Sequence, residues 1–292
     1  MFKQNIDCHN HLAEVYATSP DKALTWIKSA NEKNIGFFMQ GGIGPDNWEH
    51  QIQLKQLYPT QVGLCFGLHP YWVSENTEEQ CEQALDKLSQ YLVKYSKDKT
   101  TILAMGEIGL DFRSQIIKDN EKQQVKQPAE QQMELQIRML ELQLEMIQWF
   151  KIPAVFHLVR AFSEAQKIIN FWGDFTLKGM IHSFNGPSEQ ARYWAKKGFL
   201  LSIGGPVCHP TNQKLHKSIL EIPLEQLILE TDSPDQPPPA YPKGENPPYS
   251  LWDVAKTIGK IRNLDAEEIL DISNRNFQRV FGEVANGNES NT

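Results

Sequence analysis

The chain has 292 residues, of which 40% are hydrophobic and 22% charged, and this composition excludes a disordered protein. Its formal net charge of -7 at pH 7 excludes a general polyanion-binding surface, so any nucleic-acid contact has to come from a local basic patch or from bound metal. The sequence has no apolar run of roughly 18 or more residues and no secretory signal, which predicts a cytoplasmic protein without a membrane span.

Eight short runs rich in apolar, β-branched or aromatic residues recur along the chain, with helix signals between several of them. The runs begin at Phe2, Ile35, Val62, Thr101, Ile152, Leu177, Gly198 and Gln226. Ser19 and Pro20 predict a helix start, and the apolar spacing of residues 133, 137, 140 and 144 predicts a second helix. Apolar strands that alternate with amphipathic helices form a parallel sheet covered by helices, and eight such units close a barrel. The sequence therefore predicts an α/β protein with one domain over residues 1–292, a single (β/α)8 TIM barrel.

Two stretches interrupt the alternation. The stretch 113–132 is rich in Gln and Lys and follows the fourth predicted strand, so it is expected on the active face of a barrel, either as a tolerated surface insertion or as a functional loop. The stretch 233–250 is dense in proline and is expected to be a stiff loop before a helix that starts near Leu251. We expect a disordered tail at 283–292. The four cysteines lie far apart without a C-x-x-C pair, which predicts free, mostly buried thiols.

Side chains that bind metals stand at the ends of most predicted strands, where a barrel places its catalytic groups. The first run ends in His9 and His11, the third in His69, the fourth in Glu107, the fifth in His157, the sixth in His182 and the eighth in Asp232. Burying this set without a cation would leave unpaired polar groups, each at a cost of about 1 to 3 kcal/mol. The pattern therefore predicts a metal centre.

The predicted ligands are six: His9, His11, Glu107, His157, His182 and Asp232. They are too many for one tetrahedral ion and suit two ions about 3.5 to 4 Å apart, with Glu107 as the bridging carboxylate. A spacing of two residues puts His9 and His11 on one face of a strand, while Asn10 points away. The mixed imidazole and carboxylate ligands fit Zn, Mn, Fe, Co or Ni better than Mg, and the choice among them stays open.

Two ions that activate water favour hydrolysis as the reaction. Asp232 is expected to bind metal and to accept the proton of the attacking water, and its competing role is that of a helix cap before Ser233. His69 is expected either to donate a hydrogen bond to substrate oxygens or to orient a metal ligand without binding the metal itself. Cys8 is expected to face the wall of the barrel as a core residue.

The sequence resembles the TatD-type metal-dependent deoxyribonucleases in a series of motifs. These are DCHNH from Asp7, GLHP from Gly67, GEIGLDF from Gly106, HLVRA from His157, IHSFNGP from Ile181, ETDSP from Glu230, NPP from Asn246 and NRNFQRVF near the C-terminus. The resemblance covers essentially the whole chain. It implies a metallo-dependent hydrolase barrel of the amidohydrolase superfamily, two divalent cations, and hydrolysis of phosphodiester bonds in DNA, often as a 3'-to-5' exonuclease on single strands.

The resemblance also implies a role for each matching residue. His9 and His11 would hold the first metal, Glu107 would bridge, and His157 and His182 would hold the second. Asp232 would bind the first metal and act as the base. Relatives that hydrolyse amides, lactones or phosphotriesters often bridge with a carboxylated lysine, so Glu107 favours the nuclease branch.

The HLVRA segment departs from the family pattern H-S-R-D-A, because Val159 stands at the arginine position and Arg160 at the aspartate position. We expect Arg160 and His69 to bind substrate, with Lys243 as a weaker candidate for phosphate. The aromatic candidates for base stacking are Phe112, Tyr71, Trp72 and Phe184. The expected partner is single-stranded DNA as substrate, with no protein partner and a monomeric chain. Two alternatives stay open: a hydrolase of another ester, amide or lactone, and a metal-binding scaffold with weak or no turnover.

Overall fold

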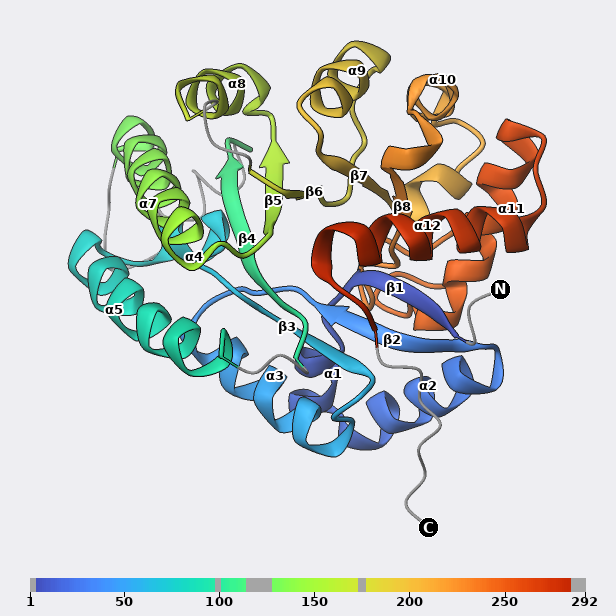
Figure 1. The fold of residues 1–292 in the computed structure, drawn as a ribbon, viewed down its shortest axis with the longest axis horizontal. Coiled ribbons are helices and arrows are strands. Elements are labelled where there is room, and N and C mark those ends of the chain that lie inside the picture. Colours follow the sequence, from blue (N-terminus) through green and yellow to red (C-terminus); the bar gives the residue numbers. More distant parts are fainter. Residues whose placement is uncertain (1–3, 98–100, 114–127, 173–176, 285–292) are drawn as a thin grey trace. The chain divides into compact units, whose positions relative to one another are not determined.

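The structure is a computed structural model that describes residues 4–97, 101–113, 128–172 and 177–284 (Figure 1). Its strands are β1 (Asn5–Asn10), β2 (Ile35–Gln40), β3 (Val62–Phe66), β4 (Leu103–Asp111), β5 (Ala154–Val159), β6 (Gly179–Ile181), β7 (Leu200–Ile203) and β8 (Leu227–Leu229). Each strand begins at the start of a predicted run or within three residues after it. The eight predicted strands are therefore confirmed.

Helices follow the strands in alternation. They are α1 (Leu12–Thr18), α2 (Pro20–Glu32), α3 (Pro45–Leu57), α4 (Pro70–Glu75), α5 (Glu78–Tyr95), α7 (Ala129–Phe150), α8 (Phe162–Phe171), α9 (Ser188–Lys196), α10 (Gln213–Glu221), α11 (Leu251–Arg262) and α12 (Ala266–Phe281), with short 3-10 turns η1 (Gly205–Cys208), η2 (Leu224–Gln226) and η3 (Pro248–Ser250). Within the described part of the chain, no helix is long and apolar enough to cross a membrane.

The strands lie in the sheet in chain order, and the described pairings are parallel. The chain after β8 runs beside β1, where Asp232 N donates to His9 O at 3.0 Å and His11 N donates to Ser233 O at 2.7 Å. A first strand next to the last strand is the neighbour relation of a closed (β/α)8 barrel.

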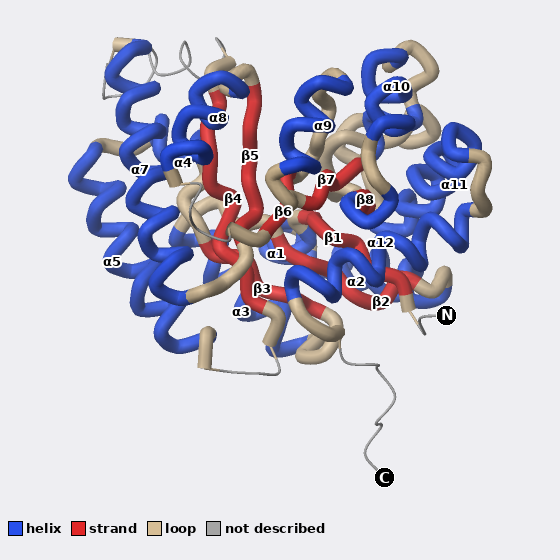
Figure 2. Tube along the Cα trace, turned by 45° about the horizontal axis from the view of Figure 1, so that its top comes forward, coloured by secondary structure: helices blue, strands red, loops and turns tan. Residues whose placement is uncertain are grey.

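The chain divides into two compact units by its internal contacts. Unit 1 comprises Met1–Gln40, His50–Leu64 and Met180–Thr292, and unit 2 comprises Gly41–Glu49 and Cys65–Gly179. In unit 1, α12 packs along β1 and β8 (Figure 1), with Asn274 Oδ1 accepting from Ile6 N at 3.0 Å and Ser273 Oγ from Leu229 N at 2.9 Å. In unit 2, α7 packs on β4 and beside α5 (Figure 2).

Two helix predictions hold, with local differences. α2 begins at Pro20 as expected, but the side chain of Ser19 makes no capping hydrogen bond. In α7, Leu140 and Leu144 are buried, whereas Met133 and Ile137 are only half-buried. Glutamines complete the buried face of this helix, and Gln143 Oε1 accepts from Leu68 N at 2.7 Å. Their side chains satisfy backbone groups at strand ends, which apolar side chains cannot do.

Some of the remaining structural predictions concern residues that the structure describes, and others concern residues that it does not describe. Residues 114–127 of the polar stretch and 285–292 of the expected tail lie outside the described residues. The proline-dense loop is irregular until η3, and α11 starts at Leu251 as predicted. The cysteines are free, with Cys8, Cys65 and Cys81 buried and Cys208 half-buried.

Candidate metal centre

Four of the predicted ligands gather in unit 1 at the start of the chain and after β6 and β8. Asp232 Oδ1 lies 3.4 Å from His11 Nε2 and 3.7 Å from His9 Nε2. The ring of His9 lies 5.1 Å from that of His11 and 4.1 Å from that of His182. Ligand atoms of His9, His182 and Asp232 all lie within 4.8 Å of one another. The structure therefore brings His9, His11, His182 and Asp232 together.

Strand geometry explains the placement of the two N-terminal histidines. His9 and His11 stand two residues apart, so both reach Asp232. Asn10 points away into a buried network, where its side chain donates to Asp7 Oδ2 at 3.2 Å and accepts from Gln40 Nε2 at 2.8 Å. Cys8 is also buried, with its Sγ 3.7 Å from Ser273 Oγ, which is the expected core role.

The Asp232 carboxyl is buried among imidazole rings. Burial by itself raises the pKa of this group, but the hydrogen bond of His11 and the nearby imidazole charges outweigh it, and the pKa falls below its ordinary value. Its backbone is left-handed at φ 58°, a conformation that Asp tolerates better than most residues. The second oxygen, Oδ2, accepts from Gln236 Nε2, and Gln236 also bonds the Ser183 hydroxyl. The helix-cap role is not what the structure shows for this side chain, because Asp232 contacts histidines and Gln236.

Two buried carboxylates that the sequence analysis did not select support this group. Glu230 Oε1 lies 3.4 Å from His182 Nδ1 and accepts from Ser183 N at 2.7 Å. Asp7 accepts from Thr231 N at 2.9 Å and from Thr231 Oγ1 at 2.6 Å, which ties the chain before Asp232 to β1. Asp7 and Glu230 belong to the motifs DCHNH and ETDSP, and each stands two positions before a predicted ligand, His9 or Asp232. This spacing is the signal that could have identified them.

The other predicted ligands gather in unit 2. His157 Nδ1 lies 3.3 Å from Glu107 Oε2, His69 Nε2 lies 3.6 Å from the same oxygen, and ligand atoms of the three residues lie within 4.8 Å of one another. The position of Glu107 corrects the sequence analysis, because β4 continues to Asp111 and Glu107 lies inside the strand. The register of β4 against β5 shifts between Gly106 and Ile108, and such an irregularity re-aims a side chain within a strand.

A third carboxylate, Asp111, was missed by the sequence analysis. Its Oδ2 lies 3.1 Å from His157 Nε2, and Arg113 Nε donates to the same carboxylate at 2.9 Å. Burial raises the pKa of Asp111, but the contacts with His157 and Arg113 outweigh it and hold the pKa well below its ordinary value. Gln136 from α7 fixes the strand here, because its Oε1 accepts from Asp111 N at 2.8 Å.

His69 occupies a defined orientation at the N-terminus of α4. Its Nδ1 accepts from Tyr71 N at 2.9 Å, so in the neutral ring the proton is on Nε2, which faces Glu107. The ring also lies against His157, with centroids 4.3 Å apart. This tautomer suits a hydrogen-bond donor to a carboxylate or a substrate oxygen.

The residues that were predicted to contact substrate lie in different parts of the chain and differ in exposure. Arg160 is exposed and has a left-handed backbone at φ 54° directly after β5, so the chain turns at this residue. Lys243 is exposed in the loop after β8. Tyr71 is exposed and Phe112 half-buried. Trp72 packs over Gly44, and Phe184 is buried with 5% exposure, which removes it from the stacking candidates.

The donors of both groups fit divalent transition metals. Imidazole nitrogens and carboxylate oxygens are the ligands of Zn, Mn, Fe, Co and Ni sites. One ion with bonds of about 2.0 to 2.2 Å can hold two ligand atoms that lie up to roughly 4.4 Å apart. The pairs Asp232–His11 and Glu107–His157, at 3.4 and 3.3 Å, lie within that reach. Buried carboxylates on the second nitrogen of His182 and of His157 are the arrangement that orients histidine ligands.

Comparison with known proteins identifies the family. A family model described as TatD related DNase matches residues 6–282. The putative deoxyribonuclease tatdn3 of Danio rerio is 27% identical over 96% of this chain and 97% of its own length. The uncharacterized metal-dependent hydrolase YjjV of Escherichia coli is 24% identical over 94% of this chain and 97% of its own.

The fold agrees with this result. The crystal structure of YjjV, a TatD homolog from Escherichia coli K12, is similar with a TM-score of 0.81 at 23% identity, over 97% of this chain and 100% of that one. Together with eight parallel strands in chain order, this likeness establishes the (β/α)8 TIM barrel. The chain belongs to the TatD-related DNase family of metal-dependent hydrolases.

Proposed function

We propose that the chain hydrolyses phosphodiester bonds in DNA, trimming single strands from the 3' end, at a centre for two divalent ions. The observation that carries this proposal is the pair of imidazole and carboxylate groups, one buried in unit 1 and one partly buried in unit 2, in a member of the TatD-related DNase family. All proposed ligands come from one chain, so a monomer suffices.

We assign His9, His11 and Asp232 to one ion and His157 and His182 to the other, with Glu107 as the bridge. The contacts of Asp232 with His9 and His11 and of Glu107 with His157 support their part of this assignment. The place of His182 beside His157 rests on the family membership. When bound, two such ions would lower the pKa of a coordinated water toward 7 and neutralise phosphate oxygens.

The protein's own groups would handle the proton and the substrate. Asp232, with a lowered pKa, is ionised at neutral pH and can accept the proton of the attacking water. His69 presents Nε2–H toward the Glu107 carboxylate and can donate to a phosphate oxygen. Arg160, exposed where the chain turns after β5, is the proposed partner of a substrate phosphate.

The test is turnover of an end-labelled single-stranded DNA by protein that has been stripped of metal and reconstituted with Zn, Mn, Mg, Ni, Co or Fe. Asp232→Asn should lower kcat by about 100- to 10,000-fold, because a positioned base contributes about that much. Asp86→Asn, at an exposed carboxylate in α5, is the matched control and should keep full activity.

The length ladder of the products gives the polarity of digestion. Intact DNA beside turnover of an ester or lactone would assign the centre to another hydrolase. Metal binding without turnover of any of these substrates would indicate a scaffold.

A further inference from the structure

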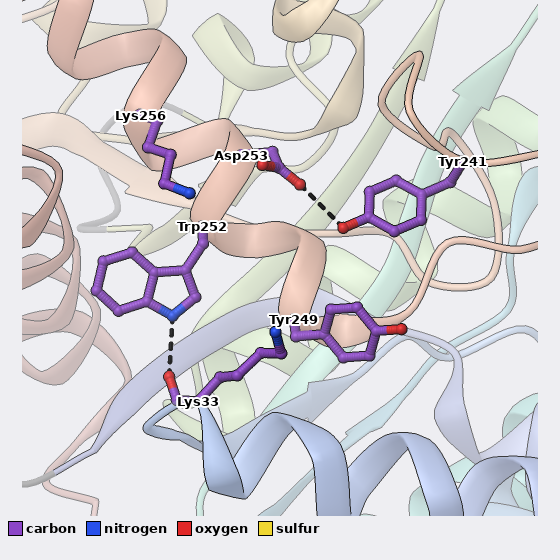
Figure 3. Close-up of a pocket in the computed structure, with 6 residues that line it drawn as sticks. All are labelled: Lys33, Tyr241, Tyr249, Trp252, Asp253 and Lys256. Carbon is purple, nitrogen blue, oxygen red and sulfur yellow. Dashed lines mark hydrogen bonds between the residues drawn. The ribbon is translucent and has the colours of Figure 1, made fainter.

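A pocket lies in unit 1, and none of its lining residues belongs to the two ligand groups. It has a volume of about 350 Å³ and is lined by Lys33, Tyr241, Tyr249, Trp252, Asp253 and Lys256 (Figure 3). Lys33 follows α2, Tyr241 belongs to the loop after β8, and the other four come from η3 and α11. The volume lies within the range of small-molecule sites, about 300 to 1,000 Å³. We call it the Trp252 pocket.

Two aromatic side chains of the Trp252 pocket, Trp252 and Tyr241, are held by their polar edges. Trp252 Nε1 donates to Lys33 O at 2.9 Å, and the Tyr241 hydroxyl donates to Asp253 Oδ2 at 3.0 Å (Figure 3). The rings of Tyr241 and Tyr249 lie 6.3 Å apart. These bonds hold the edges of Trp252 and Tyr241 and occupy neither ring face, whereas one face of Tyr249 lies toward Lys33 Nζ.

The charge of the Trp252 pocket favours an anion. Lys33 Nζ lies 5.0 Å from the centre of the Tyr249 ring, and Lys256 stands one helical turn after Trp252, on the same face of α11. Among the described residues, neither lysine has a carboxylate within ion-pair distance. The lining of the pocket thus carries two ammonium groups and one carboxylate, in a chain whose net charge is -7. This is a local basic patch of the kind that an acidic protein needs to bind a polyanion.

We propose that the Trp252 pocket binds a nucleotide unit, with the base stacked on the aromatic rings and the phosphate beside Lys33 and Lys256. Aromatic stacking combined with lysine contacts to phosphate is the common chemistry of single-strand binding. The nucleotide is either a free nucleotide or part of single-stranded DNA. The second of these two possibilities rests on the proposed function. As part of a DNA strand, the bound nucleotide would hold the DNA on the protein at a place separate from the metal ligands.

Binding to metal-free full-length protein in chelator tests the proposal, because the metal centre then contributes little affinity for phosphate. Calorimetric titration would use thymidine monophosphate, a short oligothymidylate and a long one. Lys256→Glu should weaken binding of each probe by about tenfold, because a phosphate contact is lost. Lys167→Glu makes the same charge change at an exposed lysine of α8, which does not line the pocket, and should leave binding unchanged.

A second pair of variants tests stacking. Tyr249→Leu should weaken binding by about tenfold, whereas Tyr249→Phe keeps the ring and should bind like the wild type. Affinity that rises with strand length would indicate a strand as the ligand, and equal affinity for the mononucleotide would indicate a free nucleotide. Equal dissociation constants for wild type, Lys256→Glu and Tyr249→Leu with every probe would overturn the proposal.

The outcome is separable from that of the nuclease proposal. Nucleotide binding that depends on Lys256, in a protein that leaves DNA intact with every metal, would support the pocket and reject the nuclease. Metal-dependent DNA cleavage in a protein whose nucleotide binding does not depend on Lys256 would reject the pocket alone.

Discussion

The Nδ1 atom of His182 lies 3.4 Å from Oε1 of Glu230, and both side chains are buried in unit 1. A carboxylate at Nδ1 fixes the orientation and tautomer of the ring and leaves Nε2 as the metal-binding nitrogen. Glu230→Gln should therefore weaken metal binding by about 10- to 100-fold while the chain still folds. Competition between the protein and a chromophoric zinc chelator measures this affinity.

Glu225→Gln is the control for Glu230→Gln, since it changes an exposed glutamate five residues earlier in the chain. If Glu230→Gln bound zinc as tightly as the wild type, the carboxylate would not orient His182 for a metal.

Removal of metal should lower the stability of the protein. A ligand that binds only the folded state at about 100 times its Kd adds about 2.7 kcal/mol to the free energy of unfolding. We expect the Tm to fall after dialysis against chelator and to return with Zn or Mn. Differential scanning calorimetry of stripped and reconstituted protein measures the change, and His9→Asn should reduce the recovery. A Tm that is the same in chelator and in saturating metal would contradict metal binding at these groups.

The contact between Asp111 and His157 predicts a pH-dependent contribution to stability. The pKa of Asp111 is held below its ordinary value by His157 and Arg113 despite burial. A carboxyl group whose pKa is lowered by folding contributes its full stabilisation at pH values above its unfolded pKa of 3.8. This stabilisation is lost as the pH falls toward the pKa of the folded state. Asp111→Asn should thus cost about 1 to 3 kcal/mol at neutral pH and progressively less below about pH 4.

Urea unfolding of metal-free wild type and Asp111→Asn across this pH range measures the difference. Asp86→Asn should show no such pH-dependent cost, because Asp86 is exposed. A difference between wild type and Asp111→Asn that stayed constant with pH would mean that Asp111 gains nothing from its charge in the folded state.

The Thr231 hydroxyl ties the segment before Asp232 to β1. Thr231 Oγ1 donates to Asp7 Oδ2 at 2.6 Å, and both residues are fully buried. Thr231→Val keeps the shape but removes the donor, so it should cost about 1 to 3 kcal/mol of unfolding free energy. Because Asp232 is the next residue, kcat should also fall. Thr231→Ser keeps the hydroxyl and should restore most of both quantities, as denaturant unfolding and DNA turnover would show. A Thr231→Val variant as stable and as active as the wild type would contradict this role of the hydroxyl.

The sequence alone determined the strands and their order, because each strand is a local run of apolar residues with a recognisable start and end. It also selected His9, His11, His182 and Asp232, which the structure brings together, since their positions near strand ends depend only on that local pattern. The place of Glu107 inside β4 was not visible, because the register shift that aims it depends on the pairing of β4 with β5.

The tertiary structure decided the contacts between residues far apart in the chain. Asp111 meets His157, and Glu230 meets His182, across 46 and 48 positions of sequence. Lys33 reaches Trp252 across a still longer separation. No local pattern marks such a pair, because hydrophobic periodicity records only which face of an element is buried. The partner of a buried carboxylate or an exposed lysine is set by how the elements pack, and packing joins distant segments only in the folded chain.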